Sequence, residues 1–342
     1  MNYISTLSKT TLLAIITFSI TSIAYAHTRW FADGELEPLV TDEPLSLYIT
    51  IWGGIVLAVI LVATLLQRFR WLELPSLQPK VPHSFERAAS GFTMMVGAYF
   101  VIAGSHEYFL TPNLTPEAGL PYIFIIIEIA VGLALLIGLG ARIAALVLAA
   151  AWIISFWFTG FIAGIENVWL LSTTLFIALM GNDYFALYQS NFIRDRLKRF
   201  KRYALSILRV GTGVTLMVLG LSEKIMAPEY GINFLNQYDW NFMAMLGFQY
   251  SDLLFTISAG ATEFLFGALI ALGLLTRLTV LVVAIVFTIP MFLLGPIELT
   301  GHLPHFAALV LILLYGSGQY FLPLTPRKYR QQPYRKGDQL LD

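Results

Sequence analysis

The sequence predicts an all-α membrane protein, with two tandem four-helix transmembrane bundles and one extra N-terminal transmembrane helix. Three observations support this fold class. Hydrophobic residues make up 57% of the chain and charged residues only 12%, whereas about a quarter of a soluble domain is charged. Long uncharged apolar runs alternate with short polar loops. One pattern of Glu, Gly and Arg inside these runs occurs twice.

Composition and charge exclude several classes of function. The chain contains no cysteine, which excludes disulfides, thiolate-held iron–sulfur clusters, covalent c-type haem and thiol nucleophiles. Redox chemistry would therefore need a bound cofactor or a quinone, and a metal would need His, Asp, Glu or Met ligands. The formal net charge is zero, so nothing in the charge balance favours a nucleic-acid partner.

Residues 1–26 are predicted to be a secretory signal peptide. A short polar start is followed by an apolar run, and the segment ends in Ala24-Tyr25-Ala26, which is typical of a cleavage site. An uncleaved anchor helix is the alternative. Cleavage would leave His27 at the mature N-terminus, where its α-amino group and imidazole form a chelate suited to copper.

Residues 27–87 are predicted to combine a periplasmic segment, one extra transmembrane helix and a cytoplasmic linker. The stretch 27–46 is polar and acidic, and 47–66 is an uncharged run long enough to span a bilayer. The residues that follow, up to 87, are rich in proline and basic side chains. A basic segment of this kind is expected on the cytoplasmic side.

Eight further spans are predicted in two sets of four. The first set forms a unit over 88–190 and the second a unit over 205–325, and the segment 194–202 between them and the tail 326–342 are basic. The expected spans are 88–108, 120–140, 143–163 and 168–188 in the first unit, and 205–226, 252–275, 278–296 and 304–322 in the second.

The second helix of each unit begins the repeated motif. The two copies are Glu128, Gly132, Gly138 and Arg142, and Glu263, Gly267, Gly273 and Arg277. A carboxylate inside an apolar run costs about 2.5–3.5 kcal/mol on insertion scales, so two copies in register indicate a duplicated unit. An even number of spans makes the repeats parallel, related by an axis along the membrane normal. Each unit is expected to be an up-down bundle with short turns.

The charge distribution predicts the orientation. If residues 27–46 lie outside, nearly every Lys and Arg of the mature chain falls in loops on the inner side, and acidic residues collect on the outer side. By the positive-inside rule, the mature N-terminus is expected in the periplasm and the C-terminus in the cytoplasm. The chain is therefore expected to be a multi-pass protein of a bacterial inner membrane, in contact with the lipid bilayer.

The second unit resembles the DoxX family of small four-helix membrane proteins. The resemblance rests on Arg209, on Gly220 with Glu223-Lys224, on Glu263 with Gly267, on Leu272-Gly273-Leu-Leu-Thr276-Arg277, and on His302 and His305. The first unit is a degenerate copy, with Ala141 where the second has Thr276 and Asn167 where the second has His302. The chain is thus similar to a tandem DoxX-like protein over about residues 85–325.

The resemblance implies a redox function linked to quinone, because the family takes its name from the membrane subunit of a thiosulfate:quinone oxidoreductase. Glu263, with Glu128 in the first unit, would then be a proton-accepting group near a quinone or substrate. The alternative is a structural carboxyl that hydrogen-bonds across the bundle. In hydrocarbon each carboxyl is expected to be neutral unless it is paired.

Four more charged residues are candidates for substrate or cofactor binding. Glu223 and Lys224 end the first helix of the second unit, and they are expected either to complete the rim of an outer site or to pair locally. Arg142 and Arg277 follow the glutamates by 14 residues, about 21 Å along a helix, which excludes pairing within one helix. They are expected either to anchor the chain at the inner headgroups or to bind a quinone or an anion there.

The histidines are candidate metal ligands. His302 and His305 are three residues apart, which places both rings on one side of a helix at its start and suits a shared metal ion. A third ligand such as Glu298, Glu223 or Glu263 would be needed. Simple hydrogen bonding at the membrane interface is the alternative.

Three functions follow from these candidates. The first is a redox-linked membrane subunit that exchanges electrons and protons with quinone for a periplasmic redox protein. The second is a periplasm-facing protein that binds or transports copper or zinc, through His302, His305 and His27. The third is a membrane scaffold without a catalytic site. Whether the chain is an enzyme is left open by the sequence.

Overall fold

The computed structural model of the protein describes residues 39–116, 122–188, 191–294 and 297–318. The predicted signal peptide, His27 and the basic tail 326–342 lie outside the described residues. Within the described ranges the regular elements are all helices, and the predicted all-α membrane fold is confirmed.

Each predicted span corresponds to a described helix. Five helical segments are long and apolar enough to cross a membrane: α3, α4, α6, the segment Asn191–Ile225 that contains α9, and α12. Shorter apolar helices lie in α5, α7, α13 and α14. Their bounds are α3 (Leu45–Leu66), α4 (Ser84–Ser105), α5 (Tyr122–Ile137), α6 (Ala141–Glu166), α7 (Trp169–Met180), α9 (Ala204–Leu219), α12 (Asp252–Leu272), α13 (Thr276–Leu294) and α14 (Ile297–Tyr315).

Shorter elements fill the connections between these helices. They are the 3₁₀ turns η1 (Arg70–Glu73), η2 (Pro75–Leu77), η3 (Pro112–Leu114) and η4 (Lys198–Tyr203), the π-helix η5 (Gly220–Ile225), and the helices α8 (Asn191–Leu197), α10 (Pro228–Tyr238) and α11 (Phe242–Met245).

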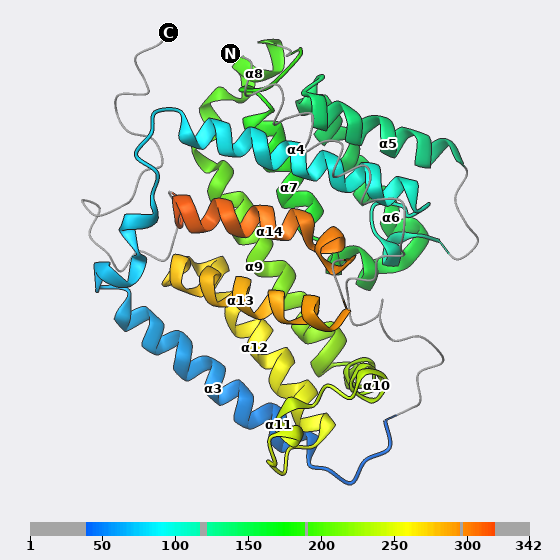
Figure 1. The fold of residues 1–342 in the computed structure, drawn as a ribbon, viewed down its shortest axis with the longest axis vertical. Coiled ribbons are helices and arrows are strands. Elements are labelled where there is room, and N and C mark those ends of the chain that lie inside the picture. The colour runs from blue at the N-terminus through cyan, green and yellow to red at the C-terminus, as the bar shows by residue number, and fades with distance from the viewer. Residues whose placement is uncertain (1–38, 117–121, 189–190, 295–296, 319–342) are drawn as a thin grey trace.

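The packing of the helices is the same in both units and indicates a pseudo-two-fold axis. In unit 1 (α4–α7), α4 packs on α5 and α6 on α7; in unit 2, α9 packs on α12 and α13 on α14. Between the units, α4 lies against α14 and α7 against α9, as Figure 1 shows. Each first helix thus meets the fourth helix of the other unit, which is the pairing that a two-fold axis generates.

Glycines allow the first two helices of each unit to approach closely. A Cβ added to Gly97 would lie 2.6 Å from the carbonyl oxygen of Gly132, and one added to Gly213 would lie 2.5 Å from that of Gly267. Small residues at helix contacts are the usual means of close packing in membranes. Two of the motif glycines predicted from the sequence, Gly132 and Gly267, therefore serve as contact points between helices.

The other two motif glycines end the second helices. Gly138 has φ +70° and Gly273 has φ +75°, a conformation that glycine adopts without strain. The chain then reverses within three residues, since α6 begins at Ala141 and α13 at Thr276.

The extra helix α3 packs on α12 of unit 2, although unit 1 follows it in the sequence. Its contact is a small cluster in which Ala63 meets Leu269, Leu274 and Leu275. Most of the remaining α3 side chains are exposed and apolar, as expected for a helix that faces lipid.

Two sequence expectations were wrong in detail. The connection from first to second helix is not a short turn in either unit, because it contains η3 in unit 1 and both α10 and α11 in unit 2. The fourth helix of unit 2 begins at Ile297 rather than 304 and runs through Pro304, so His302 and His305 lie inside it rather than at its start. Membrane helices tolerate an internal proline when neighbouring groups satisfy the freed carbonyl.

Candidate functional site

The bundle has two chemically different ends, a basic end and an acidic end. At the basic end, α5 and α12 end, and Arg142 and Arg277 begin α6 and α13. At the acidic end, α4, α6 and α9 end near Glu107, Glu166 and Glu223. In Figure 1 the basic end of α4, α13 and α14 lies at the left and their acidic end at the right.

An ion pair lies at the acidic end of unit 2. The Nζ atom of Lys224 is 2.9 Å from Oε2 of Glu263, and the two side chains are 16% and 29% exposed. Gly260 brings their backbones together, because a Cβ on it would lie 2.7 Å from both the carbonyl oxygen of Gly220 and the Cβ of Lys224. The structure thus pairs two predicted site residues across separate helices.

The lysine is carried by the π-helix η5, which continues α9 for one wider turn. Such π-turns occur mostly as single turns and often at functional sites. Glu223, on the same turn, is 1% exposed and is close enough to act electrostatically on the ammonium of Lys224. Lys224 is therefore paired with Glu263 and adjoins the buried Glu223 in sequence, in a cluster within apolar helices.

The corresponding place in unit 1 has no lysine. Alignment of the repeats puts Tyr108 where unit 2 has Lys224. Glu128, the counterpart of Glu263, is 3% exposed, and its Oε2 accepts a hydrogen bond of 3.0 Å from the backbone N–H of Leu110. The carbonyl of Leu110 in turn accepts from the hydroxyl of Tyr99 at 2.9 Å. In unit 1 the carboxyl of Glu128 is thus bonded by the backbone of the 106–116 loop. In unit 2 the equivalent carboxyl, Glu263, is bonded by the ammonium of Lys224.

Further polar contacts close unit 1 at this end. Asn113, from the same loop, donates to Glu166 at 3.4 Å and accepts from Asn167 at 2.9 Å. The indole N–H of Trp169 donates to Asn167 at 3.2 Å. Asn167 stands where unit 2 has His302. The loop therefore covers the acidic end of unit 1 and buries its polar groups.

Arg142 is committed to protein partners at the basic end. Its guanidinium makes two hydrogen bonds to Asp183, of 2.7 and 2.8 Å, and one of 3.0 Å to the carbonyl of Met180. The residue is 4% exposed. Because Met180 ends α7, Arg142 satisfies a free C-terminal carbonyl and complements the helix dipole.

Arg277 does the same for α14. It donates to the carbonyls of Leu313 at 2.8 Å, Leu314 at 3.0 Å and Glu73 at 3.0 Å, and it is fully buried. Both motif arginines therefore point into the protein, where each caps the fourth helix of its unit. The anchoring hypothesis expected each guanidinium to face the lipid headgroups. Instead, each one is bonded to carbonyl oxygens of the protein.

Glu73 joins this basic-end junction from the linker after α3. Its carboxylate accepts a hydrogen bond from the side chain of Gln67, and the Oε1 of Gln67 accepts from the N–H of Leu275 at 2.6 Å. Burial raises the pKa of Glu73, while the bond from Gln67 and the charge of Arg277 oppose that rise. The junction fastens α3 to unit 2.

Arg209 is a structural residue whose role the sequence did not indicate. It is 1% exposed and donates to the carbonyls of Ser317, at 2.9 Å, Ile270 and Ala271. Unit 1 replaces it with two smaller groups: Asn182 donates to Leu135 at 3.1 Å, and Thr93 donates to Gly181 at 3.1 Å. Alignment of the two repeats shows that unit 1 lacks this arginine. Only the structure shows that Asn182 and Thr93 make the corresponding hydrogen bonds.

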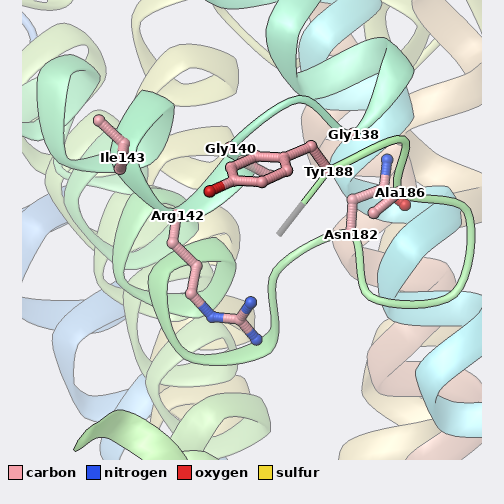
Figure 2. Close-up of a pocket in the computed structure, with 8 residues that line it drawn as sticks. Gly138, Gly140, Arg142, Ile143, Asn182, Ala186 and Tyr188 are labelled. Carbon is pink, nitrogen blue, oxygen red and sulfur yellow. The ribbon is translucent and has the colours of Figure 1, made fainter. Parts of the chain in front are cut away.

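A small pocket adjoins the basic end of unit 1. It is lined by Gly138, Gly140, Ala141, Arg142, Ile143, Asn182, Ala186 and Tyr188. Figure 2 shows the side chain of Arg142 extending away from the ring of Tyr188. Since its guanidinium is bonded to Asp183 and Met180, the charge of Arg142 is already engaged.

The two predicted metal-ligand histidines are neighbours on α14. The ring centroids of His302 and His305 are 6.0 Å apart, and His305 also packs on Trp169 of unit 1 with centroids 5.0 Å apart. Among the residues that the structure describes, no cluster of three or more His, Asp or Glu side chains could hold a metal ion.

The comparisons with known proteins identify the repeat. The sequence profile of the DoxX family matches residues 86–178 and again residues 204–296. Together the two matches cover more than half of the chain; the first runs from α4 into α7 of unit 1, and the second from α9 through α13 of unit 2. Neither the curated proteins nor the solved structures include a match to this chain.

Proposed function

The chain belongs to the DoxX family, and from that premise we propose that it is a redox-linked membrane subunit. It would exchange protons and electrons with quinone for a redox protein on the acidic side. With the basic end in the cytoplasm, this side faces the periplasm of a bacterial inner-membrane protein. The site of proton exchange is the cluster of Glu223, Lys224 and Glu263 in unit 2.

The observation that carries this proposal is the Lys224–Glu263 ion pair, with the buried Glu223 on the same π-turn as the lysine. With all three groups ionised, the cluster has a net charge of −1, which is costly among apolar helices. Binding one proton neutralises it. The cluster therefore favours exchange of a single proton, and Glu263 is the more accessible acid because its side chain is 29% exposed.

The proton balance of quinone chemistry gives this cluster a role. Reduction of a quinone to a quinol takes two electrons and two protons. The electrons would come from the partner, because the sequence has no cysteine to hold an iron–sulfur cluster. Glu263 would donate a proton to a quinone oxygen and be reprotonated from the acidic side. Lys224 would position Glu263, and Glu223 would set the charge of the cluster.

Unit 1 supports the assignment to unit 2 by contrast. Its glutamate, Glu128, has Leu110 as a backbone partner and Tyr108 in place of the lysine. The carboxyl is also sealed from solvent, with 3% exposure. We therefore assign a structural role to Glu128 and proton exchange to Glu263.

The test compares Glu263→Gln with the matched variant Glu128→Gln. Purified protein in liposomes containing a short-chain ubiquinone analogue is supplied with a chemical reductant, and proton uptake is followed with a pH indicator. Protein-free liposomes give the background. Glu263→Gln should slow protein-dependent uptake by at least about a hundredfold, the usual size of an acid–base contribution, whereas Glu128→Gln should retain it.

Equal rates for Glu263→Gln and wild type, in protein that elutes as a folded species, would overturn the proposal. The metal and scaffold alternatives remain predictions from the sequence. The metal alternative expects stoichiometric copper or zinc that is lost in His302→Ala, and elemental analysis of the same preparations tests it.

A further inference from the structure

The linker between the two units has a surface that the proposed function does not use. Residues 194–202 contain six Lys and Arg side chains and one acidic residue, Asp195. Lys201 is held by Asp183 at 3.4 Å. Among the others, Arg196, Arg199 and Arg202 are exposed. The surface is therefore strongly cationic in a chain whose formal net charge is zero.

Aromatic rings support these three arginines. The guanidinium carbon of Arg196 lies 4.3 Å from the ring centroid of Phe192, and that of Arg199 lies 4.6 Å from the centroid of Phe200. Arg202 lies 4.8 Å from the ring of Tyr203. Such stacking holds a guanidinium in place but leaves its edge N–H groups able to donate; in Arg202, Nη2 already donates to the hydroxyl of Tyr203 at 2.7 Å, and its other N–H groups remain. The arrangement repeats three times along one short segment.

The two phenylalanine rings are themselves exposed, and Tyr203 is half-buried. Phe192 is 66% and Phe200 38% exposed, and nearby exposed residues of the same linker are Tyr184, Phe185, Leu187 and Tyr188. The linker joins the end of α7 to the start of α9, so it runs along the basic end of the bundle. That end is where transmembrane helices meet the headgroup layer.

We propose that the linker is a binding surface for anionic phospholipid headgroups. The exposed rings would insert at the acyl boundary, and each stacked guanidinium would donate two parallel hydrogen bonds to a phosphate. A cluster of this size gains about fivefold in affinity per basic residue at an anionic surface.

The test measures lipid binding to the purified full chain in detergent by native mass spectrometry. Phosphatidylglycerol and phosphatidylcholine of identical acyl chains are added separately to wild type and to the triple variant Arg196→Gln, Arg199→Gln and Arg202→Gln. Wild type should bind phosphatidylglycerol more tightly, and each lost arginine should reduce that preference by roughly fivefold. Arg68→Gln is the matched control, because Arg68 also stacks on a ring, Phe69, at 5.0 Å but stands outside the linker.

A second arm uses wild type alone and so does not depend on the folding of a variant. Raising the salt to about 1 M should remove the preference, because the screening length falls to about 3 Å. A preference that survives both high salt and the triple substitution would overturn the proposal, as would equal binding of the two lipids. Competition by inorganic phosphate alone at the same concentration would indicate a free-anion site and also reject the lipid assignment.

Discussion

At the scale of single residues, this protein contains more buried charge than its apolar composition suggests, and most of that charge has an assigned structural partner. Arg142, Arg209 and Arg277 are each at most 4% exposed, and each donates to carbonyls at helix C-termini. Membrane helices have no water at such ends to satisfy their last carbonyls. A buried guanidinium with several donors meets that need.

Arg142→Gln should therefore destabilise the protein by about 2–3 kcal/mol. The substitution removes the paired bond to Asp183 and the cap on Met180, while Lys201, at 3.4 Å, still offsets part of the charge of Asp183. Chemical unfolding in detergent measures the change. In the double variant Arg142→Gln, Asp183→Asn, part of the loss should be recovered, because the carboxylate that lost its guanidinium is removed as well; the recovery is partial because Lys201 then loses its partner. Additive losses would contradict the pairing.

Glu73 gives a prediction about pH. Because burial raises its pKa above the ordinary 4.5, the folded state binds the proton more tightly than the unfolded state. Stability from this residue is thus present at low pH and lost as pH rises through the folded-state pKa. Glu73→Gln keeps the bond from Gln67 but does not titrate. Its free energy of unfolding, relative to wild type, should rise across this window and then level off; a constant difference at all pH values would reject the argument.

At the scale of elements, the close contacts between first and second helices depend on glycine. In Gly267→Ala, the new methyl group would lie 2.5 Å from the carbonyl oxygen of Gly213, and that backbone atom cannot move aside cheaply. The expected loss is about 1–3 kcal/mol, the usual cost of overpacking.

Gly53→Ala is the matched control for this prediction. Gly53 lies in α3, and a Cβ there would meet nothing within 4 Å. This substitution should be neutral, or stabilising by up to about 1 kcal/mol because alanine favours the helix. Thermal unfolding of both variants in one detergent compares them directly. Similar losses in the two would mean that the α9–α12 contact is looser than described.

At the scale of the whole molecule, the two units are held together by helix packing as well as by the covalent linker. The α4–α14 and α7–α9 contacts join them, and α3 packs on α12 from the far end of the chain. A protease site inserted between Lys198 and Arg199 should therefore yield two fragments that still elute together after cleavage. Separate elution in mild detergent would show that the inter-unit contacts are too weak to hold the units together.

The sequence alone determined the membrane class, the spans and the tandem repeat. These properties depend on apolar run length and on residues such as Glu128 and Glu263 at matching offsets, and both are local in the chain. The helix-ending glycines Gly138 and Gly273 were also part of that pattern, because a tight turn imposes its own residue preference.

Only the tertiary structure decided how the charged residues are used. Lys224 and Glu263 are 39 residues apart, and Arg277 meets Glu73 over 204 residues. Such pairings depend on the angles and depths at which helices pack, which apolar periodicity does not encode. For the same reason, the sequence treated Glu128 and Glu263 alike. The partner of Glu128 is a backbone N–H in the 106–116 loop, whereas the partner of Glu263 is an ammonium on the π-helix η5.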